Sequence, residues 1–347
     1  MRAPSFRPAG ARPRPAAAAL AACLAAAAVA AHAQGAGAAG GLRIHGELDA
    51  GFGTFKPPGG ERVGRVESGL WSPSYLAFSG AEPLGGSLRA VFSLETYVAL
   101  DNGVAYSAFY PDDPFWGRAA YVGLEGRLGA LTLGRNRNPF YYAATAGNAF
   151  GESYFSPALT VGAFRRGHVI GRAHDNSVRY TSPTWGGAHF SVLWAPKEEK
   201  SNGNDVAATA EYAGGPWHAT LGLAQAKTGL DEGRSSRIGL AALSHDFGVA
   251  KLFVAYATQR DTQVRAKSRA WDLGATVPLG RTTLKVSVAR IRQTDLDGGS
   301  AASERVVSLG ADHRLAPDCW LYAAVKSDRI DGLSRGTSVA TGMRWLF

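Results

Sequence analysis

The sequence predicts an all-β fold, a transmembrane antiparallel β-barrel of 16 strands, and three observations favour it. First, the chain ends on an alternating segment whose apolar face carries Val339, Thr341, Met343, Trp345 and Phe347. Successive strand residues point to opposite faces, so this pattern suits a sheet between two solvents. Second, glycine is frequent, at 44 of 347 residues, and no apolar run after the N-terminal segment reaches the roughly 20 residues of a membrane-spanning helix. Third, short and long connections alternate along the chain, as in transmembrane barrels.

The first 33 residues have the organisation of a secretory signal peptide. A basic start with four arginines precedes an Ala/Leu run over 16–31, and Ala31-His32-Ala33 forms a small-residue cleavage site. We therefore assign 1–33 to a cleaved signal peptide, 34–41 to a flexible start of the mature chain, and 42–347 to the barrel. A lipoprotein cleavage site at Cys23 is the less favoured alternative, because more apolar residues follow it.

Loss of this segment changes both the charge and the cysteine content. It removes four arginines and no acid, which leaves 33 Lys and Arg against 28 Asp and Glu, a formal charge of +5 in place of +9. Cys319 is then the only cysteine, so the mature chain has no intramolecular disulfide. Its length exceeds the usual size of one soluble core and suits one large barrel.

The connections fall into two classes that alternate in chain order. Short turns are expected at 82–86, 126–129, 184–187, 214–216, 246–248, 278–280 and 316–318. Longer polar loops are expected around 57–70, 101–116, 136–175, 196–204, 229–236, 261–268, 294–304 and 329–336. Seven turns and eight loops join 16 strands, an even number that closes an antiparallel barrel with both termini at one end.

Alternation within the strands predicts which face meets lipid. In segments such as 205–213, 270–277, 283–289 and 306–314, one face is apolar and the other polar or charged. We expect Lys285 and Arg344 to face the lumen, and Val286, Val339 and Met343 to face lipid. A soluble β-sandwich shows the same alternation, and the strand number, the export signal and the terminal phenylalanine favour the barrel.

Several segments, in this order, resemble the trimeric general porins of Gram-negative bacteria, especially the proteobacterial branch with anion-preferring pores. The segments that carry the resemblance are 42–51, 68–82, 84–95, 121–124, 131–136 and 176–183. The resemblance implies a homotrimer in the bacterial outer membrane. It also implies passive diffusion of small hydrophilic solutes and ions through a water-filled pore, without a cofactor.

The resemblance also implies a site. In these proteins the third loop folds into the lumen and narrows it, and basic strand residues face it; here that loop is 137–175. The implied pore constriction comprises Arg89, Arg135, Arg165, Arg166, Arg172, Arg179, Glu47 and Glu152, with Arg172 and Arg179 as alternatives for one rung. The chain has Ala149 where the family carries an acid, so we expect a net-positive constriction that prefers small anions.

The resemblance names further partners. Phe347 and Trp345 are expected to form the signal for the barrel-assembly machinery, and outer-membrane lipid and lipopolysaccharide are expected to surround the barrel. The dispersed charges and the export signal argue against nucleic-acid binding.

Other functions receive less support. A substrate-specific channel, an aromatic sugar track inside the pore, and an adhesive surface protein stay open as alternatives. A barrel enzyme such as a lipase is disfavoured, because the G-x-S-x-G match at 332–336 lies in a loop between strands and not at a strand-to-helix elbow. The histidines show no metal-ligand spacing, so we expect no metal and no catalysis.

Overall fold

The computed structural model describes residues 41–105, 114–157, 171–196, 203–226, 235–262, 264–299 and 301–347. The predicted signal peptide 1–33 and residues 34–40 lie outside this part of the chain. The described strands are β1 Arg43–Phe55, β2 Val63–Ser68, β3 Tyr75–Gly85, β4 Leu88–Tyr97, β5 Ala119–Gly126, β6 Gly129–Arg137, β7 Ala173–Thr181, β8 Ala188–Ala195, β9 Asp205–Gly214, β10 Trp217–Ala226, β11 Ser236–Asp246, β12 Lys251–Asp261, β13 Ala266–Leu279, β14 Thr282–Asp295, β15 Ala301–Ala316, β16 Cys319–Ile330 and β17 Gly336–Leu346. Helix α2 spans Pro139–Ala146. Within these ranges, no helix is both long and apolar enough to cross a bilayer.

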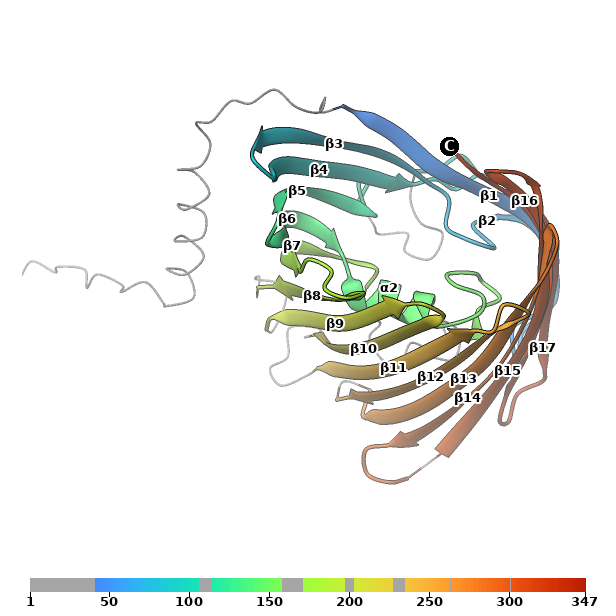
Figure 1. Ribbon diagram of the computed structural model, residues 1–347. Coiled ribbons are helices and arrows are strands. Elements are labelled where there is room, and N and C mark those ends of the chain that lie inside the picture. Colours follow the sequence, from blue (N-terminus) through green and yellow to red (C-terminus); the bar gives the residue numbers. More distant parts are fainter. Residues whose placement is uncertain are drawn as a thin grey trace, which may run out of the picture.

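All strands belong to one antiparallel sheet that curves round and closes on itself (Figure 1). Closure is made by β1 and β17, which pair from Glu47 opposite Leu346 to Thr54 opposite Val339. Closure therefore gives the strands of the ring hydrogen-bond partners on both sides, except for the short β2, whose described pairing is with β1 alone. The transmembrane barrel expected from the sequence is confirmed.

Strands β2 and β3 together fill one position beside β1. The first half of β1, from Arg43 to Glu47, pairs with β3, and its second half, from Ala50 to Phe55, pairs with β2. The 17 described segments therefore occupy 16 positions in the ring, as predicted. Between β2 and β3 the chain leaves the sheet at Gly69, whose φ of 71° suits glycine, and buries Leu70 and Trp71.

Side chains alternate between two faces as the sequence predicts. On the outer face Val286 is 38% exposed, and Val339 and Met343 are 48% exposed. On the inner face Lys285 Nζ lies 3.0 Å from Asp312 Oδ2, and Arg344 Nη1 lies 3.7 Å from Glu47 Oε1. Charged pairs inside and apolar side chains outside match water in the lumen and lipid around the barrel.

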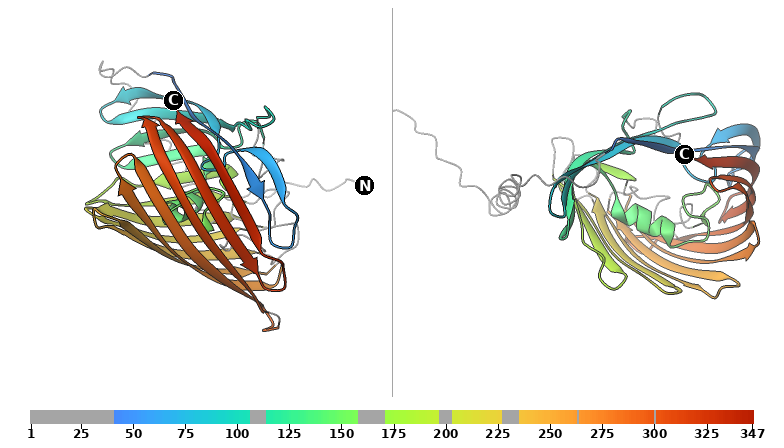
Figure 2. Two further views of the ribbon diagram at one scale, coloured as in Figure 1. Left: turned by 90° about the vertical axis from the view of Figure 1, so that its right-hand side faces the viewer. Right: turned by 45° about the horizontal axis from the view of Figure 1, so that its top comes forward.

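Helix α2 lies inside the ring of strands and contacts β8, β9 and β10 (Figures 1 and 2). It begins after Asn138, whose side chain accepts a hydrogen bond from the Phe140 backbone N–H, and Pro139 occupies the first turn. Phe140 and Tyr141 are buried, so this short helix is held mainly by packing. The segment after β6 therefore lies against the inner wall of the barrel.

The two faces of β14 give a direct test of the register. We predict that Val286→Arg lowers the free energy of unfolding by about 2–4 kcal/mol, because a charge at mid-membrane depth meets hydrocarbon. Lys285→Gln removes the ion pair with Asp312, whose side chains are 17% and 16% exposed, but keeps a polar side chain in the lumen, so we expect the smaller loss. Urea unfolding in lipid vesicles measures both. Equal losses from the two substitutions would show that the register is displaced by one residue.

Candidate functional site

Three inward-facing glycines make room for the loop segment that follows β6. A Cβ built on Gly222 would lie 2.9 Å from the Phe140 ring. One on Gly274 would lie 2.9 Å from Ala149 Cβ, and one on Gly310 would lie 3.0 Å from the Phe150 ring. At these three positions on β10, β13 and β15, the lack of a side chain therefore makes room for the loop.

Aromatic and polar contacts hold the tip of the loop on this wall. Trp71 stacks on Tyr322 with ring centroids 4.9 Å apart, and Phe150 packs edge-on against Trp71 at 6.0 Å. Ser153 Oγ donates a hydrogen bond to the Leu70 carbonyl at 3.0 Å. Lys326 Nζ donates to the Tyr154 carbonyl at 2.8 Å. The tip is thus tied to β16 and to the chain between β2 and β3.

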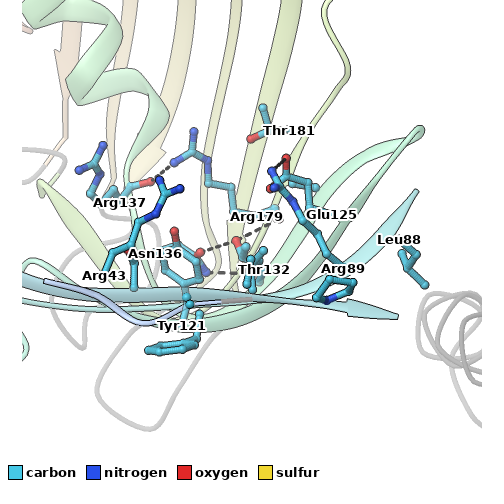
Figure 3. Close-up of a pocket in the computed structure, with 18 of the residues that line it drawn as sticks. Arg43, Leu88, Arg89, Tyr121, Glu125, Thr132, Asn136, Arg137, Arg179 and Thr181 are labelled. Atoms are coloured by element: carbon cyan, nitrogen blue, oxygen red, sulfur yellow. Dashed lines mark hydrogen bonds and ion pairs between the residues drawn. The ribbon is translucent and has the colours of Figure 1, made fainter. Parts of the chain in front are cut away.

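Arginines gather on the wall formed by β1 and β3 to β7. A cavity of about 920 Å³ there is lined by Arg43, Arg89, Arg137 and Arg179, with Glu95 and Glu125 as the acids of its lining. Figure 3 shows the side chains of these four arginines extending from the strands into the cavity. Four guanidinium groups against two carboxylates leave this wall net positive.

The two acids are each held by an arginine. Arg89 Nη2 lies 2.5 Å from Glu125 Oε1. Glu95 accepts hydrogen bonds from Arg118 and, at 3.5 Å, from Arg137. Arg118 also stacks on the Tyr75 ring, 3.6 Å from its centroid. Because Glu95 is shared by two arginines, its negative charge is more than compensated locally.

Arg172 and Arg179 were alternatives for one rung, and the structure places them differently. Arg179 lines the cavity, and its Nη1 donates a hydrogen bond to the Arg137 carbonyl at 3.2 Å. Arg172 Nε donates to the Tyr141 hydroxyl of α2 at 2.9 Å, and its guanidinium lies over Tyr97 and Tyr141. Burial raises the pKa of Tyr141, so its phenol stays neutral and does not cancel the charge of Arg172.

Arg135 does not take the place expected for it. It pairs with Ala120, on the same face as Val122, which is 62% exposed, so its backbone directs it outward. Its guanidinium is held by the Gly117 carbonyl at 2.6 Å and by Asp175 at 2.7 Å. It is not among the residues that line the cavity. Plain alternation explains this, because Arg135 shares the parity of the outward residues Leu131 and Leu133, and the pairing of β6 with β7 becomes irregular only between Gly134 and Asn136.

The remaining expected residues divide between the two walls. Glu47 faces Arg344 across 3.7 Å, and Glu152 lies at the loop tip, next to Ser153. Both acids therefore belong to the side of the lumen that carries the loop tip. Arg165 and Arg166 fall outside the described residues.

Sequence reasoning missed Arg43, Arg118 and Arg137. Arg43 could have been found, because it shares the inward parity of Glu47 on the first strand. Arg137 has the parity of Arg135 and reaches the lumen only because of the irregular pairing after Gly134. Arg118 precedes β5 and is positioned by its contacts with Glu95 and Tyr75. These contacts are distant in the sequence, so no local sequence pattern predicts them.

The match to a catalytic serine motif carries no site. Ser334 lies in the turn between β16 and β17, where its carbonyl accepts a hydrogen bond from Gly59 N. A nucleophile elbow requires a strand followed by a helix, and two strands flank this turn.

Comparison with known proteins gives consistent matches. The family model described as Gram-negative porin matches residues 16–333. The outer membrane porin protein 32 of Delftia acidovorans is 31% identical over 282 residues, which cover 76% of each chain. Among solved structures, an anion-selective porin from Comamonas acidovorans aligns with a TM-score of 0.75 at 24% identity, over 89% of this chain and 100% of that one. The trimer form of OmpT from Vibrio cholerae aligns with a TM-score of 0.69 at 16% identity, over the same shares.

The glycine seats generate a prediction for the width of the lumen. Gly274→Val pushes Ala149 away from β13 toward the arginine wall, so we expect the single-channel conductance in planar bilayers to fall. Overpacking of this kind costs about 1–3 kcal/mol of stability. Ala275→Val, on the outer face of the same strand, is the matched control and should leave the conductance unchanged. An unchanged conductance in folded Gly274→Val would mean that this contact does not position the loop.

Proposed function

The chain belongs to the Gram-negative porin family and forms a channel for passive diffusion in the outer membrane, and from this premise we propose that its pore prefers small anions because of its arginine wall. The loop seated on β10, β13 and β15 constricts the lumen and directs solutes past this wall. The observation that carries the proposal is the gathering of Arg43, Arg89, Arg137 and Arg179 around one cavity.

The physical argument rests on charge in a narrow aqueous passage. Low-dielectric walls focus the field of fixed charges, so a net-positive lining raises the local concentration of anions and lowers that of cations. Glu95 and Glu125 are each paired with an arginine, so neither opposes the field alone. The structurally similar porin from Comamonas acidovorans is anion-selective, which agrees with this direction.

The opposing wall supplies the counterpart charges. Glu47 and Glu152 lie on the side of the lumen that carries the loop tip, where Lys285, Lys326 and Arg344 also face inward. Cations on that wall offset part of its acid charge, so the positive potential that we propose is local to the arginine wall. We propose passive movement of small hydrophilic solutes and ions, with no bound cofactor and no catalytic step.

The same proposal covers processing and assembly. We propose cleavage after Ala33 and assembly of the mature chain into a homotrimer in a membrane that contains lipopolysaccharide. The trimer is supported by the trimer form of OmpT from Vibrio cholerae, which has the same fold. We also propose that Phe347 and Trp345 form the signal read by the barrel-assembly machinery.

Reversal potentials under a salt gradient test the proposed selectivity. We predict anion selectivity in the wild type and a weaker preference in Arg137→Gln/Arg179→Gln. A unit charge about 10 Å from an ion in water contributes roughly 0.4 kcal/mol, about a factor of two in occupancy. Each charge raises anion occupancy and lowers cation occupancy by this factor, so removal of two charges should lower the anion-to-cation permeability ratio roughly 16-fold.

Arg135→Gln is the matched control for this measurement. Its side chain lies outside the cavity lining, so the permeability ratio should stay at the wild-type value. A cation-selective wild type would contradict the proposed function. A shift in Arg135→Gln equal to that of the double variant would show that the wall described here is not the selective element.

Deletion of Phe347 tests the assembly signal. The Phe347 backbone exchanges two hydrogen bonds with Gly46, of 2.9 and 3.1 Å, at the seam between β1 and β17. We predict slower assembly and less heat-modifiable barrel after the deletion, because both bonds and the terminal ring are lost. Phe347→Tyr keeps an aromatic terminus and should assemble normally. Equal barrel yields from the deletion and the wild type would count against the signal.

A further inference from the structure

Asp49 is a buried acid on the inner face of β1, away from the arginine wall. Arg344 lies opposite it in the register but forms its ion pair with Glu47. Among the residues that the structure describes, no basic side chain forms an ion pair with Asp49. Burial of a carboxyl group is costly unless hydrogen bonds compensate for the lost water, so its hydrogen-bond partners indicate its role.

Tyr322 provides one of these hydrogen bonds from two strands away. Its hydroxyl donates to Asp49 Oδ1 at 2.8 Å. Tyr322 lies on β16 and pairs with Gly342 of β17, which in turn pairs with Gly51 of β1. A Cβ built on Gly51 would lie 2.8 Å from the Tyr322 hydroxyl, and one on Gly342 would lie closer still. The two glycines therefore leave a path over β17, and the hydrogen bond bridges the seam where the ring of strands closes.

The same acid holds the chain that leaves the sheet after β2. The Trp71 backbone N–H donates to both carboxyl oxygens of Asp49, at 3.3 Å. The Asp49 backbone N–H donates to Ser74 Oγ at 2.8 Å, and the Asp49 carbonyl accepts a hydrogen bond from Gly69 N–H at 2.8 Å. Asp49 thus fixes both ends of this segment and the tryptophan between them.

Trp71 and its neighbour contact the tip of the loop that follows β6. The Trp71 ring stacks on Tyr322 and is met edge-on by Phe150. The Tyr154 backbone N–H donates to the Leu70 carbonyl at 2.9 Å. An unbroken series of contacts therefore runs from the barrel seam to the loop tip.

We propose that Tyr322 is a positioning residue that couples closure of the barrel to seating of the loop. Its hydrogen bond to Asp49 forms only when β1 lies beside β17, and the same carboxyl group then receives Trp71. The loop tip is therefore fully seated only in a closed ring. This inference rests on the proposed function, because it takes the seated loop to narrow the lumen.

Tyr322→Phe removes one oxygen atom and keeps the ring that stacks on Trp71. It leaves a buried carboxyl oxygen without its donor, so the ratio of released to seated loop should rise roughly 10- to 100-fold. Single-channel recordings in planar bilayers should then show repeated steps between two conductance levels in place of one steady level. Tyr256→Phe removes the same atom from the outer face of β12 and should keep the steady level.

Thiol accessibility reports the loop tip independently of the current. In a Cys319→Ser background, Ala149→Cys places a thiol at a buried position of the loop. A maleimide should react slowly with this thiol, and roughly 10- to 100-fold faster once Tyr322→Phe is added, because reaction follows the released fraction. Both measurements use barrel that shows the heat modifiability of the wild type.

A disulfide between the loop and the wall distinguishes positioning of the loop from support of the barrel. A Cβ built on Gly274 would lie 2.9 Å from Ala149 Cβ, so cysteines at both positions reach disulfide geometry after a small separation. With this disulfide formed in the Cys319→Ser background, Tyr322→Phe should again give one steady level. Reduction of the disulfide should bring back the steps.

Two results would overturn the inference. One is a folded Tyr322→Phe variant in which the thiol at position 149 reacts at the wild-type rate. The other is a set of conductance steps that persists with the disulfide formed, which would place the disturbance in the barrel and not in the loop. Wild-type conductance together with the faster thiol reaction would contradict the constriction in the proposed function and leave the coupling standing.

Discussion

The structure depends on one constraint, that backbone N–H and C=O groups in a bilayer have no water to bond. An open sheet would leave two unpaired edges in lipid, so the pairing of β1 with β17 is required for every other strand to be stable there. Closure then divides space into an outer apolar solvent and an inner aqueous one. Each strand residue faces one or the other, and this sets where charge can stand: Lys285 and Arg344 inside, Val286 and Met343 outside.

Within the closed ring, function follows from how the lumen is divided. Glycines at 222, 274 and 310 remove side chains from one wall, and the loop fills that space. The opposite wall keeps its long side chains, and arginines predominate among its charged residues. Inward-facing positions thus have two roles. On one wall glycines make room for the loop, and on the other wall arginines line the passage. The acid Glu95 lets Arg118 and Arg137 approach each other, so it organises the positive wall and does not neutralise it.

The fold was predictable because period-two alternation and turn spacing are local properties of a sequence. The strand number, the closure and the facing of Lys285 and Val286 follow from them. The site was less predictable. Regular alternation directs Arg135 outward together with Leu133, against the resemblance, and the irregular pairing after Gly134 brings Arg137 inward. Arg118 precedes its strand and is placed by tertiary contacts alone. The break at Gly69, which carries Trp71 to the loop tip, ends a stretch that was expected to be a loop, 57–70, but contains β2.

The central claim is that the lumen beside β6 and β7 is electropositive, and cysteine modification measures this directly. In a Cys319→Ser background, Thr132→Cys places a thiol in the cavity opposite Arg179, and Leu133→Cys places one on the outer face. Rates of reaction with negatively and positively charged methanethiosulfonates report the local potential at each thiol. The account predicts that Thr132→Cys reacts faster with the anionic reagent than with the cationic one, after correction for their rates with free cysteine. Equal rates, or a faster cationic reaction, would contradict it.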